Sequence, residues 1–378
     1  MIPFARMLEY GNVAPERIRI TKMDAGTDHI ALLYSNGELY TRGNGGAGRL
    51  GTGNTISNYT SWSLVLTDVK DVWCGNSFTI ALKKDNTFWL VGNNNPFGTT
   101  GNFLTWTERT SFFTDAGVLG SDIKQIELGS NSMYVLSRSN ILYIAGRNLG
   151  GELGTGTASA VTQLTYKDSD VQLVSYCNDF AAYSKLDGTL YRSGYGAFYQ
   201  RGDGSTDYML SSTVLPAPNN MELIEFNVTS RDVYYLYRNK STGISSLYVN
   251  GTNSSGELGL NSTSIVPVQT TSSIYDGRVL SVKTRYSLLH KMIYTVDGVY
   301  SSGANNTGQC GVGNTNSISV FTKCVGLPEG EPQYMLPFNE HGTMISIKDS
   351  IFWCGSNAQF IGGTGVQNTF IKLSTPYN

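Results

Sequence analysis

The side chains best able to do chemistry in this chain do not assemble into a recognisable catalytic motif. Its three histidines are His29, His290 and His341. The first two fall at one position of an internal repeat, where Phe78 and Phe180 stand in other copies. Catalysis needs one fixed side chain with its partners in reach. A position that accepts either histidine or phenylalanine therefore predicts packing and hydrogen bonding rather than acid–base chemistry or metal binding.

Other short combinations are also better explained without a reaction. Glu340 beside His341, and the pair Asp168 and Asp170, are ordinary loop residues, and no residue has the local context of a catalytic triad. Residues 201–203 spell Arg-Gly-Asp, but so short a motif often occurs by chance. The glycine-rich loops lead into strands, whereas a phosphate loop leads into a helix N-terminus. We therefore predict no catalytic residue, no metal site and no cofactor, and we expect a protein that is not an enzyme.

The five cysteines do not have the pattern of a disulfide framework or of a zinc site. Their number is odd and no two are spaced as C-x-x-C, so neither a set of disulfides nor a zinc site is indicated. Cys74, Cys177 and Cys354 stand within strand-like runs and are expected to be buried thiols. Residues 1–6 lack the pattern of a secretory signal, and no run of 18 apolar residues could span a membrane. We expect synthesis in the cytoplasm and no membrane insertion.

Composition argues for a protein partner rather than nucleic acid. Only 15% of the residues are charged and the net charge is −2, whereas nucleic-acid binding needs a basic surface. The polar surface must come instead from Asn, Ser, Thr and Gly, together with 23 tyrosines. Tyrosine offers a rigid apolar ring with a polar tip, which suits specific contacts.

The elements that carry these residues follow an internal repeat. Seven glycines, each at the end of a hydrophobic strand pair, recur at intervals of 48 to 57 residues: Gly43, Gly92, Gly146, Gly194, Gly251, Gly303 and Gly355. Within each repeat, a turn such as Ser35-Asn36-Gly37 marks a tight hairpin. Four short strands in about 50 residues are typical of one propeller blade. The sequence therefore predicts an all-β, seven-bladed β-propeller of four-stranded antiparallel blades.

The repeat also sets the expected domain organisation. Residues 1–18 form a separate N-terminal segment, and residues 19–375 form the propeller. The expected repeats are 19–67, 68–121, 122–168, 169–219, 220–275, 276–327 and 328–375.

The glycine-rich loop of each repeat carries a family resemblance. Its form is G-x-N-x-x-G-[QE]-L-G-x-G, matched by residues 146–156, 251–259 and 303–313, and by the first repeat with Gly45 in place of Asn. With the preceding hairpin, this resembles the regulator of chromosome condensation repeat, over roughly residues 19–375. The resemblance implies a seven-bladed propeller. The member that gives the family its name is an exchange factor for the small GTPase Ran and has a basic tail, which this chain lacks.

Three repeats depart from the loop pattern, carrying Phe97, Tyr199 and Phe360 where the second glycine is expected. A glycine there usually serves a positive φ or a close backbone approach, so an aromatic residue must strain or redirect the loop. Either the rings fold under the loop as local core, or they form an aromatic patch that faces a partner. The candidate partner-binding residues are Phe97, Phe103, Trp106, Phe198, Tyr199 and Phe360.

Two further features suggest docking. Residues 3–8 look like an additional fourth strand, which gives eight candidates for seven positions. Either this segment pairs across the closure of the ring, or it or residues 374–378 leave the disc to contact a neighbour. The possible docking arm is Pro3, Phe4, Met7 and Leu8. Residues 102–122 and 211–220 are predicted to be long loops, and the first is expected to pack on one face and help form a protein contact.

These observations favour a non-enzymatic binding or structural propeller. We expect a component of a bacteriophage particle, in its tail, collar or decoration, that contacts other virion proteins or a host-surface receptor or glycan. The opening residues 1–10 look similar to leaders of bacteriophage virion proteins. Two alternatives remain: a guanine-nucleotide exchange factor for a small GTPase, and an inhibitor or glycan-binding propeller. Fold alone does not choose among them.

Overall fold

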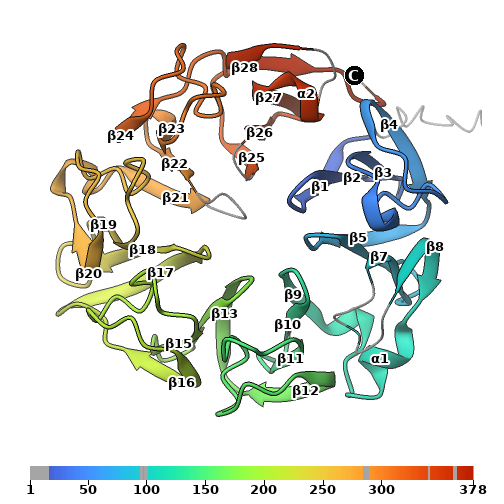
Figure 1. Cartoon of the computed structure of the whole chain (residues 1–378), viewed down its shortest axis with the longest axis horizontal. Helices are drawn as coiled ribbons and strands as arrows, with labels where there is room; N and C mark the ends of the chain where they lie inside the picture. Colours follow the sequence, from blue (N-terminus) through green and yellow to red (C-terminus); the bar gives the residue numbers. More distant parts are fainter. Residues whose placement is uncertain are drawn as a thin grey trace, which may run out of the picture.

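A computed structural model describes residues 17–93, 97, 101–283, 289–338, 341–360 and 364–377. It forms a closed ring of seven four-stranded sheets around a central channel (Figure 1). Neighbouring strands within every sheet are antiparallel. The prediction of an all-β, seven-bladed propeller is confirmed.

The blades follow one another in chain order. Blade 1 contains β1 (Ile20–Ala25), β2 (His29–Tyr34), β3 (Leu39–Gly43) and β4 (Asn58–Leu66); blade 2 contains β5 (Val69–Cys74), β6 (Phe78–Lys83), β7 (Phe88–Asn93) and β8 (Asn102–Glu108); blade 3 contains β9 (Ile123–Leu128), β10 (Ser132–Ser137), β11 (Leu142–Gly146) and β12 (Val161–Asp168). Blade 4 contains β13 (Val171–Cys177), β14 (Phe180–Lys185), β15 (Leu190–Gly194) and β16 (Met209–Leu215); blade 5 contains β17 (Met221–Val228), β18 (Asp232–Asn239), β19 (Ser245–Gly251) and β20 (Val266–Thr271). Blade 6 contains β21 (Val279–Lys283), β22 (His290–Thr295), β23 (Gly298–Gly303) and β24 (Ile318–Lys323); blade 7 contains β25 (Pro332–Phe338), β26 (Gly342–Ile347), β27 (Ser350–Ser356) and β28 (Val366–Leu373).

Helices are few and short. They are α1 (Thr110–Thr114), α2 (Asn357–Phe360) and the 3-10 turns η1 (Gly46–Gly48), η3 (Gly120–Asp122) and η4 (Ser273–Tyr275). None of the helices in the described part of the chain is long and apolar enough to cross a membrane.

Packing between blades explains the hydrophobic pattern. The second strand of a blade, such as β2 or β10, is buried along its whole length because both of its faces meet neighbouring sheets. The outermost strands, such as β4 and β12, alternate or expose much of their length. The apolar side chains form seven clusters, among them one between β1 and β26 that joins the first and last blades.

The recurring glycines have a steric cause. Gly43 has a φ of +118°, and a Cβ placed on it would lie 2.4 Å from the carbonyl oxygen of Asp28. Gly303 is alike, with a φ of +107° and 2.0 Å to the carbonyl oxygen of Leu289. Only glycine tolerates both the left-handed backbone and this contact. The third strand of every blade therefore carries a glycine at its last position or, in β7 and β27, at the position before it, and this is the period that the sequence displays.

The prediction of two long loops, residues 102–122 and 211–220, is wrong. Residues 102–122 contain β8, α1 and η3, and residues 211–215 belong to β16. Phe113 of α1 is fully buried and stacks on Phe88 with ring centroids 3.8 Å apart. The interpretation failed because an outer strand alternates weakly and resembles a loop in sequence. The expected protein contact of residues 102–122 stays a prediction.

The C-terminal residues add polar and aromatic contacts where the ring closes, between blades 7 and 1. Trp62 Nε1 of β4 donates to the Ser374 carbonyl at 3.2 Å, and the Tyr377 ring meets Tyr34 edge-on at 4.8 Å. Of the alternatives for the chain ends, the one in which residues 374–378 leave the disc is therefore wrong for 374–377, which lie on blade 1 (Figure 1). Every blade takes all four strands from its own repeat. The possible docking arm, Pro3, Phe4, Met7 and Leu8, lies outside the described residues.

Candidate functional site

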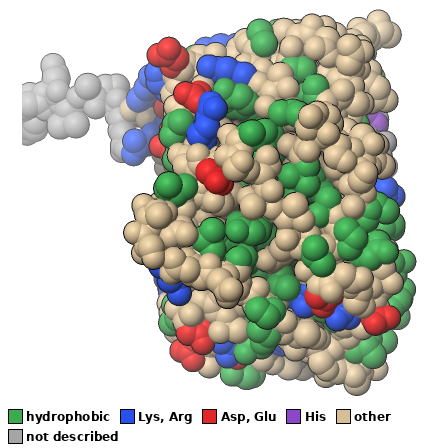
Figure 2. All heavy atoms as spheres, turned by 90° about the vertical axis from the view of Figure 1, so that its left-hand side faces the viewer, with side chains coloured by type: hydrophobic (Ala, Val, Ile, Leu, Met, Phe, Trp, Pro, Cys, Tyr) green, Lys and Arg blue, Asp and Glu red, His purple; other side chains and the backbone are tan. Residues whose placement is uncertain are grey.

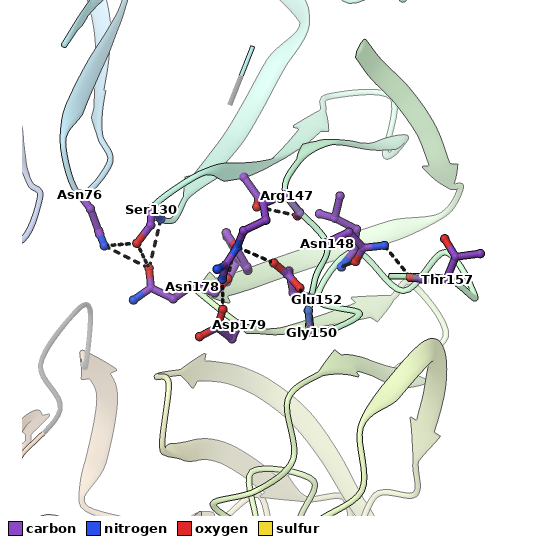
Figure 3. Close-up of polar contacts among 12 residues, drawn as sticks. Asn76, Ser130, Arg147, Asn148, Gly150, Glu152, Thr157, Asn178 and Asp179 are labelled. Carbon is purple, nitrogen blue, oxygen red and sulfur yellow. Dashed lines mark hydrogen bonds and ion pairs between the residues drawn. The ribbon is translucent and has the colours of Figure 1, made fainter. Parts of the chain in front are cut away.

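The polar residues of the glycine-rich loops hold the loops themselves. In blade 3, Asn148 Oδ1 accepts the Leu153 N–H at 2.8 Å, and its Nδ2 donates to the Thr157 carbonyl at 2.8 Å (Figure 3). Glu152 Oε2 accepts the Gly150 N–H at 2.8 Å. The same bonds recur around Asn253 and Glu257 in blade 5 and around Asn305 and Gln309 in blade 6. These six side chains are fully buried, so their motif is structural.

Most of these loops also lie over the outer strand of the next blade. Gly156 N donates to the Leu210 carbonyl at 2.8 Å, and Gly204 N donates to the Pro267 carbonyl at 3.0 Å. Equivalent bonds join blade 1 to 2, blade 5 to 6 and blade 6 to 7. In the described part of the chain, the other two seams carry short helices instead: α1 lies against β12, and α2 lies against β3 and β4. The ring is thus fastened in two different ways.

The three departures from the glycine pattern have three different outcomes. Phe97 is buried, 6% exposed, and packs against Phe112 and Phe113 with ring centroids 4.6 and 6.3 Å away. It is therefore closed to a partner and belongs to the core, as one of the two interpretations held. Phe360 ends α2, and its side chain lies outside the described part.

Tyr199 keeps the conformation of the glycine that it replaces. Its φ is +63°, close to +76° for Gly151 and +79° for Gly256. The loop of blade 4 is therefore strained rather than redirected. A bulky residue in the left-handed region costs about 1–2 kcal/mol, and such strain is concentrated at functional sites.

An aromatic cluster surrounds this strained loop. The Tyr195 ring meets Phe198 at 5.8 Å and Tyr208 at 4.8 Å between centroids, both edge-on. The Arg231 guanidinium of blade 5 lies 5.2 Å from the Phe198 ring centroid. Tyr208 is 56% exposed. We name Tyr195, Phe198 and Tyr208 the blade-4 aromatic patch. Phe198 was predicted; Tyr195 and Tyr208 were missed, although the sequence shows that no other loop carries so many aromatic residues.

Ion pairs and amides make the neighbouring surface rigid. Arg147 of blade 3 pairs with Asp179 of blade 4 and approaches Glu152 at 3.4 Å (Figure 3). Burial raises the pKa of Glu152. Nearer the channel, Asn178 Oδ1 accepts from the Ser130 N–H at 3.1 Å and from Asn76 Nδ2 at 3.2 Å. These contacts join blades 2, 3 and 4, so the face beside the aromatic patch is preorganised for binding.

The remaining predicted residues lie elsewhere. Phe103 and Trp106 are partly buried on β8 at the rim; the first packs beneath Arg109 at 4.6 Å, and the second lies against Gly51 of blade 1. Phe103 packs against the same apolar cluster as Phe97, whereas Phe198 and Tyr199 lie together in the blade-4 loop.

His29 and His290 are structural, as their shared repeat position predicts. His29 Nε2 lies 2.8 Å from Thr79 Oγ1, and His290 Nε2 lies 3.0 Å from Thr343 Oγ1, each in the following blade. Burial, with Lys291 nearby, lowers the pKa of His290 to about 3. The described residues contain no cluster of three or more potential metal ligands.

The central channel holds a cavity of about 380 Å³ that is lined by four carboxylates and three lysines. Lys22 pairs with Asp71 and Lys283 pairs with Glu225, both at 2.5 Å and both between adjacent blades. Pairs of this kind join blades. Both lysines are neutralised by their partners, so neither is available to attract an anionic ligand.

No family model matches the chain. It is 31% identical to the X-linked retinitis pigmentosa GTPase regulator of Canis lupus familiaris, over 35% of this chain but only 14% of that protein. It is 24% identical to the ultraviolet-B receptor UVR8 of Arabidopsis thaliana, over 95% of this chain and 82% of that one.

Solved structures support the fold. Human WBSCR16 has a TM-score of 0.70 at 16% identity, covering 88% of each chain. A chain in the complex of Kap60 with yeast RCC1 (Prp20) has a TM-score of 0.73 at 13% identity, covering all of this chain and 91% of that one. The chain therefore has the fold of an RCC1-like seven-bladed propeller.

Proposed function

We propose that this propeller is a non-enzymatic binding protein that holds a protein partner on its glycine-loop face, at the blade-4 aromatic patch. The observation that carries the proposal is the cluster of Tyr195, Phe198 and Tyr208 beneath Arg231, beside the strained Tyr199. Tyrosine and arginine are enriched among the residues that dominate binding energy at interfaces.

The rest of the surface supports a partner of protein type. Figure 2 shows a rim where backbone and uncharged polar side chains together predominate, hydrophobic side chains gather in patches, and charged side chains are scattered. Ile265 and Val268, near and on β20, are 53% and 49% exposed. A surface with so little net charge selects partners by shape and aromatic contact rather than by long-range attraction.

We further propose that the partner belongs to a bacteriophage particle, with the protein residing in the virion as a tail, collar or decoration component. The low charge, the polar and tyrosine-rich composition and the absence of a catalytic motif in the sequence support this setting. The test is to sequence the genes beside its own and to identify the proteins of purified particles by mass spectrometry. Finding the chain outside particles, among housekeeping genes, would contradict the setting.

A guanine-nucleotide exchange factor is the second candidate. Its support is the likeness to a protein named as a GTPase regulator and the fold shared with yeast RCC1. The longest turn between second and third strands in the described blades is the five-residue one from Lys240 to Ile244, so no bulky wedge is present there. Acceleration of nucleotide release from purified small GTPases would favour this candidate over a virion role. An inhibitor or a glycan binder remains a third.

The aromatic patch can be tested directly. The chain is co-expressed with the structural proteins encoded beside it, and affinity for any that associates is measured. Phe198→Ala and Tyr208→Ala are expected to weaken association at least about tenfold, as loss of an interface anchor does. Tyr166→Ala is the matched control, since Tyr166 is 58% exposed but lies on β12 at the rim. Equal affinity in all three variants would place the partner on another surface.

A further inference from the structure

A second site lies at the seam between blades 7 and 1, away from the aromatic patch. The C-terminal residues run beside β4 (Figure 1) and leave a groove of about 430 Å³ between the two. Tyr40 and Arg42 of β3 form its floor, Thr60, Ser61 and Trp62 of β4 form one wall, and residues 373–376 form the other. None of these lining residues is acidic.

Arg42 is a buried cation with one edge left open. The residue is only 4% exposed, and its Nε and Nη2 both donate to the Tyr59 carbonyl, at 3.0 and 2.6 Å. Its guanidinium lies 5.7 Å from the Trp62 ring centroid, which fixes its plane. Nη1 has no hydrogen bond within the described chain, yet it is not among the polar atoms sealed from solvent. The groove is the opening that reaches it.

Within the described residues, no carboxylate compensates this charge. No described acidic side chain lies within ion-pair distance of Arg42, whereas Arg192, buried to a similar degree, pairs with Asp203 at 3.0 Å. Burial alone lowers the pKa of Arg42 to about 10, so it stays protonated at neutral pH. A buried cation without an anion is costly, and an anion that enters the groove would recover that cost.

We propose that this groove binds an acidic monosaccharide unit, with the sugar carboxylate on Arg42 Nη1 and the sugar ring in the open part of the groove, beside the hydrogen bond between Trp62 and Ser374 that bridges its two walls. The volume exceeds what a lone carboxylate fills, and a few polar groups among apolar walls are typical of a small-molecule site. Tyr40 and Trp62 offer apolar ring surface, while the Thr60 and Ser61 hydroxyls can bond sugar hydroxyls. A guanidinium is the preferred partner of a carboxylate.

The test is isothermal titration of the full chain with sodium glucuronate, compared with glucose, acetate and a short glutamate-containing peptide. Glucuronate is expected to bind at least about tenfold more tightly than each of the other three, because only it offers both the carboxylate and the ring. Acetate equal to glucuronate would mean a bare anion site, and a tighter peptide would mean a protein partner. Either result overturns the sugar assignment, as does no binding of glucuronate at millimolar concentration.

Variants locate the site. Arg42→Gln is expected to lose at least about tenfold in glucuronate affinity. Arg278→Gln, which removes an exposed arginine that precedes β21 and pairs with Asp297 in blade 6, should leave the glucuronate affinity unchanged. Thr60→Glu covers the case in which Arg42→Gln fails to fold, since it supplies a carboxylate from an exposed position of β4. Thr60→Glu should abolish glucuronate binding and raise the melting temperature of the protein. If Arg42→Gln or Thr60→Glu still binds glucuronate as the wild type does, the proposal is overturned.

Discussion

In the glycine-rich loops, some residues serve folding and others are candidates for contact with a partner. Asn148 and Glu152 are buried and bonded to their own loop, so their recurrence reports the fold. Tyr199, by contrast, is a bulky residue that adopts the left-handed backbone conformation that glycine has in the other loops. That strain gives the first residue-scale prediction.

Tyr199→Gly is expected to raise the free energy of unfolding by about 1 kcal/mol, because it relieves the left-handed conformation, while it lowers affinity for the partner. Urea denaturation and a binding titration measure the two effects. Gly151→Ala is the converse control: its Cβ would lie 2.8 Å from the Leu210 Cα, so stability should fall. A Tyr199→Gly protein that is less stable than the wild type would show that the ring contributes to the core.

His290 gives a prediction about pH. Its pKa falls from 6.5 to about 3 on burial, so the unfolded chain takes up a proton below pH 6.5 that the folded chain does not. Stability due to this group is complete above pH 6.5 and is lost as pH falls toward 3, by about 2 kcal/mol at pH 5. His290→Phe, which copies Phe78 and Phe180 of other blades, should be less sensitive to acid by that amount. Denaturation curves of the wild type and of His290→Phe at pH 7.5 and pH 5 measure the effect. An equal loss of stability in the two proteins between these pH values would contradict the prediction.

At the scale of elements, an irregular segment adds a contact across the seam between blades 7 and 1, where an apolar cluster already joins β1 and β26. Tyr377 meets Tyr34 and Tyr40 edge-on, at 4.8 and 6.5 Å, and its hydroxyl bonds with Glu38 and Asn36. The hydrogen bond with Tyr377 lowers the pKa of Glu38. The last blade is therefore tied to the first by side chains more than 300 residues apart.

Tyr377→Ala is expected to lower the free energy of unfolding by about 1–2 kcal/mol, since two aromatic contacts and their hydrogen bonds are lost. Differential scanning fluorimetry would show a lower melting temperature. Tyr166→Ala, an exposed tyrosine outside the seam, is the control and should change it little. Equal melting temperatures for both variants would mean that the ring closes without this contact.

For the whole molecule, the two ways of fastening the blades predict where the ring opens. The glycine loops of blades 1, 3, 4, 5 and 6 bond to the next blade, whereas α1 and α2 lie at the other two seams. Fewer backbone bonds cross those seams within the described chain. Hydrogen exchange should therefore be faster in β4 and β12 than in β16 and β20. Uniform exchange across the four outer strands would contradict this.

The fold could be predicted from the sequence because its period rests on a local steric rule. At Gly43 and Gly303, the left-handed backbone and a nearby carbonyl exclude other residues, so the repeat remains visible. The site could be predicted only in part. The burial of Phe97 depends on Phe113, which lies on α1 sixteen residues later in the sequence and packs against it. The partners of Phe198, which include Arg231 of another blade, depend on tertiary contact that no local pattern displays.

The C-terminal clasp has a mechanical consequence. A pull on the C-terminal end acts first on Tyr377 and Ser374, which are bound to blade 1, and only then on β28 of blade 7. Under tension the first event is therefore release of residues 374–377 from blade 1, at a force set by a few side chains, while the apolar cluster between β1 and β26 still joins the two blades. In an assembly that loads this end, the segment would detach before the ring opens.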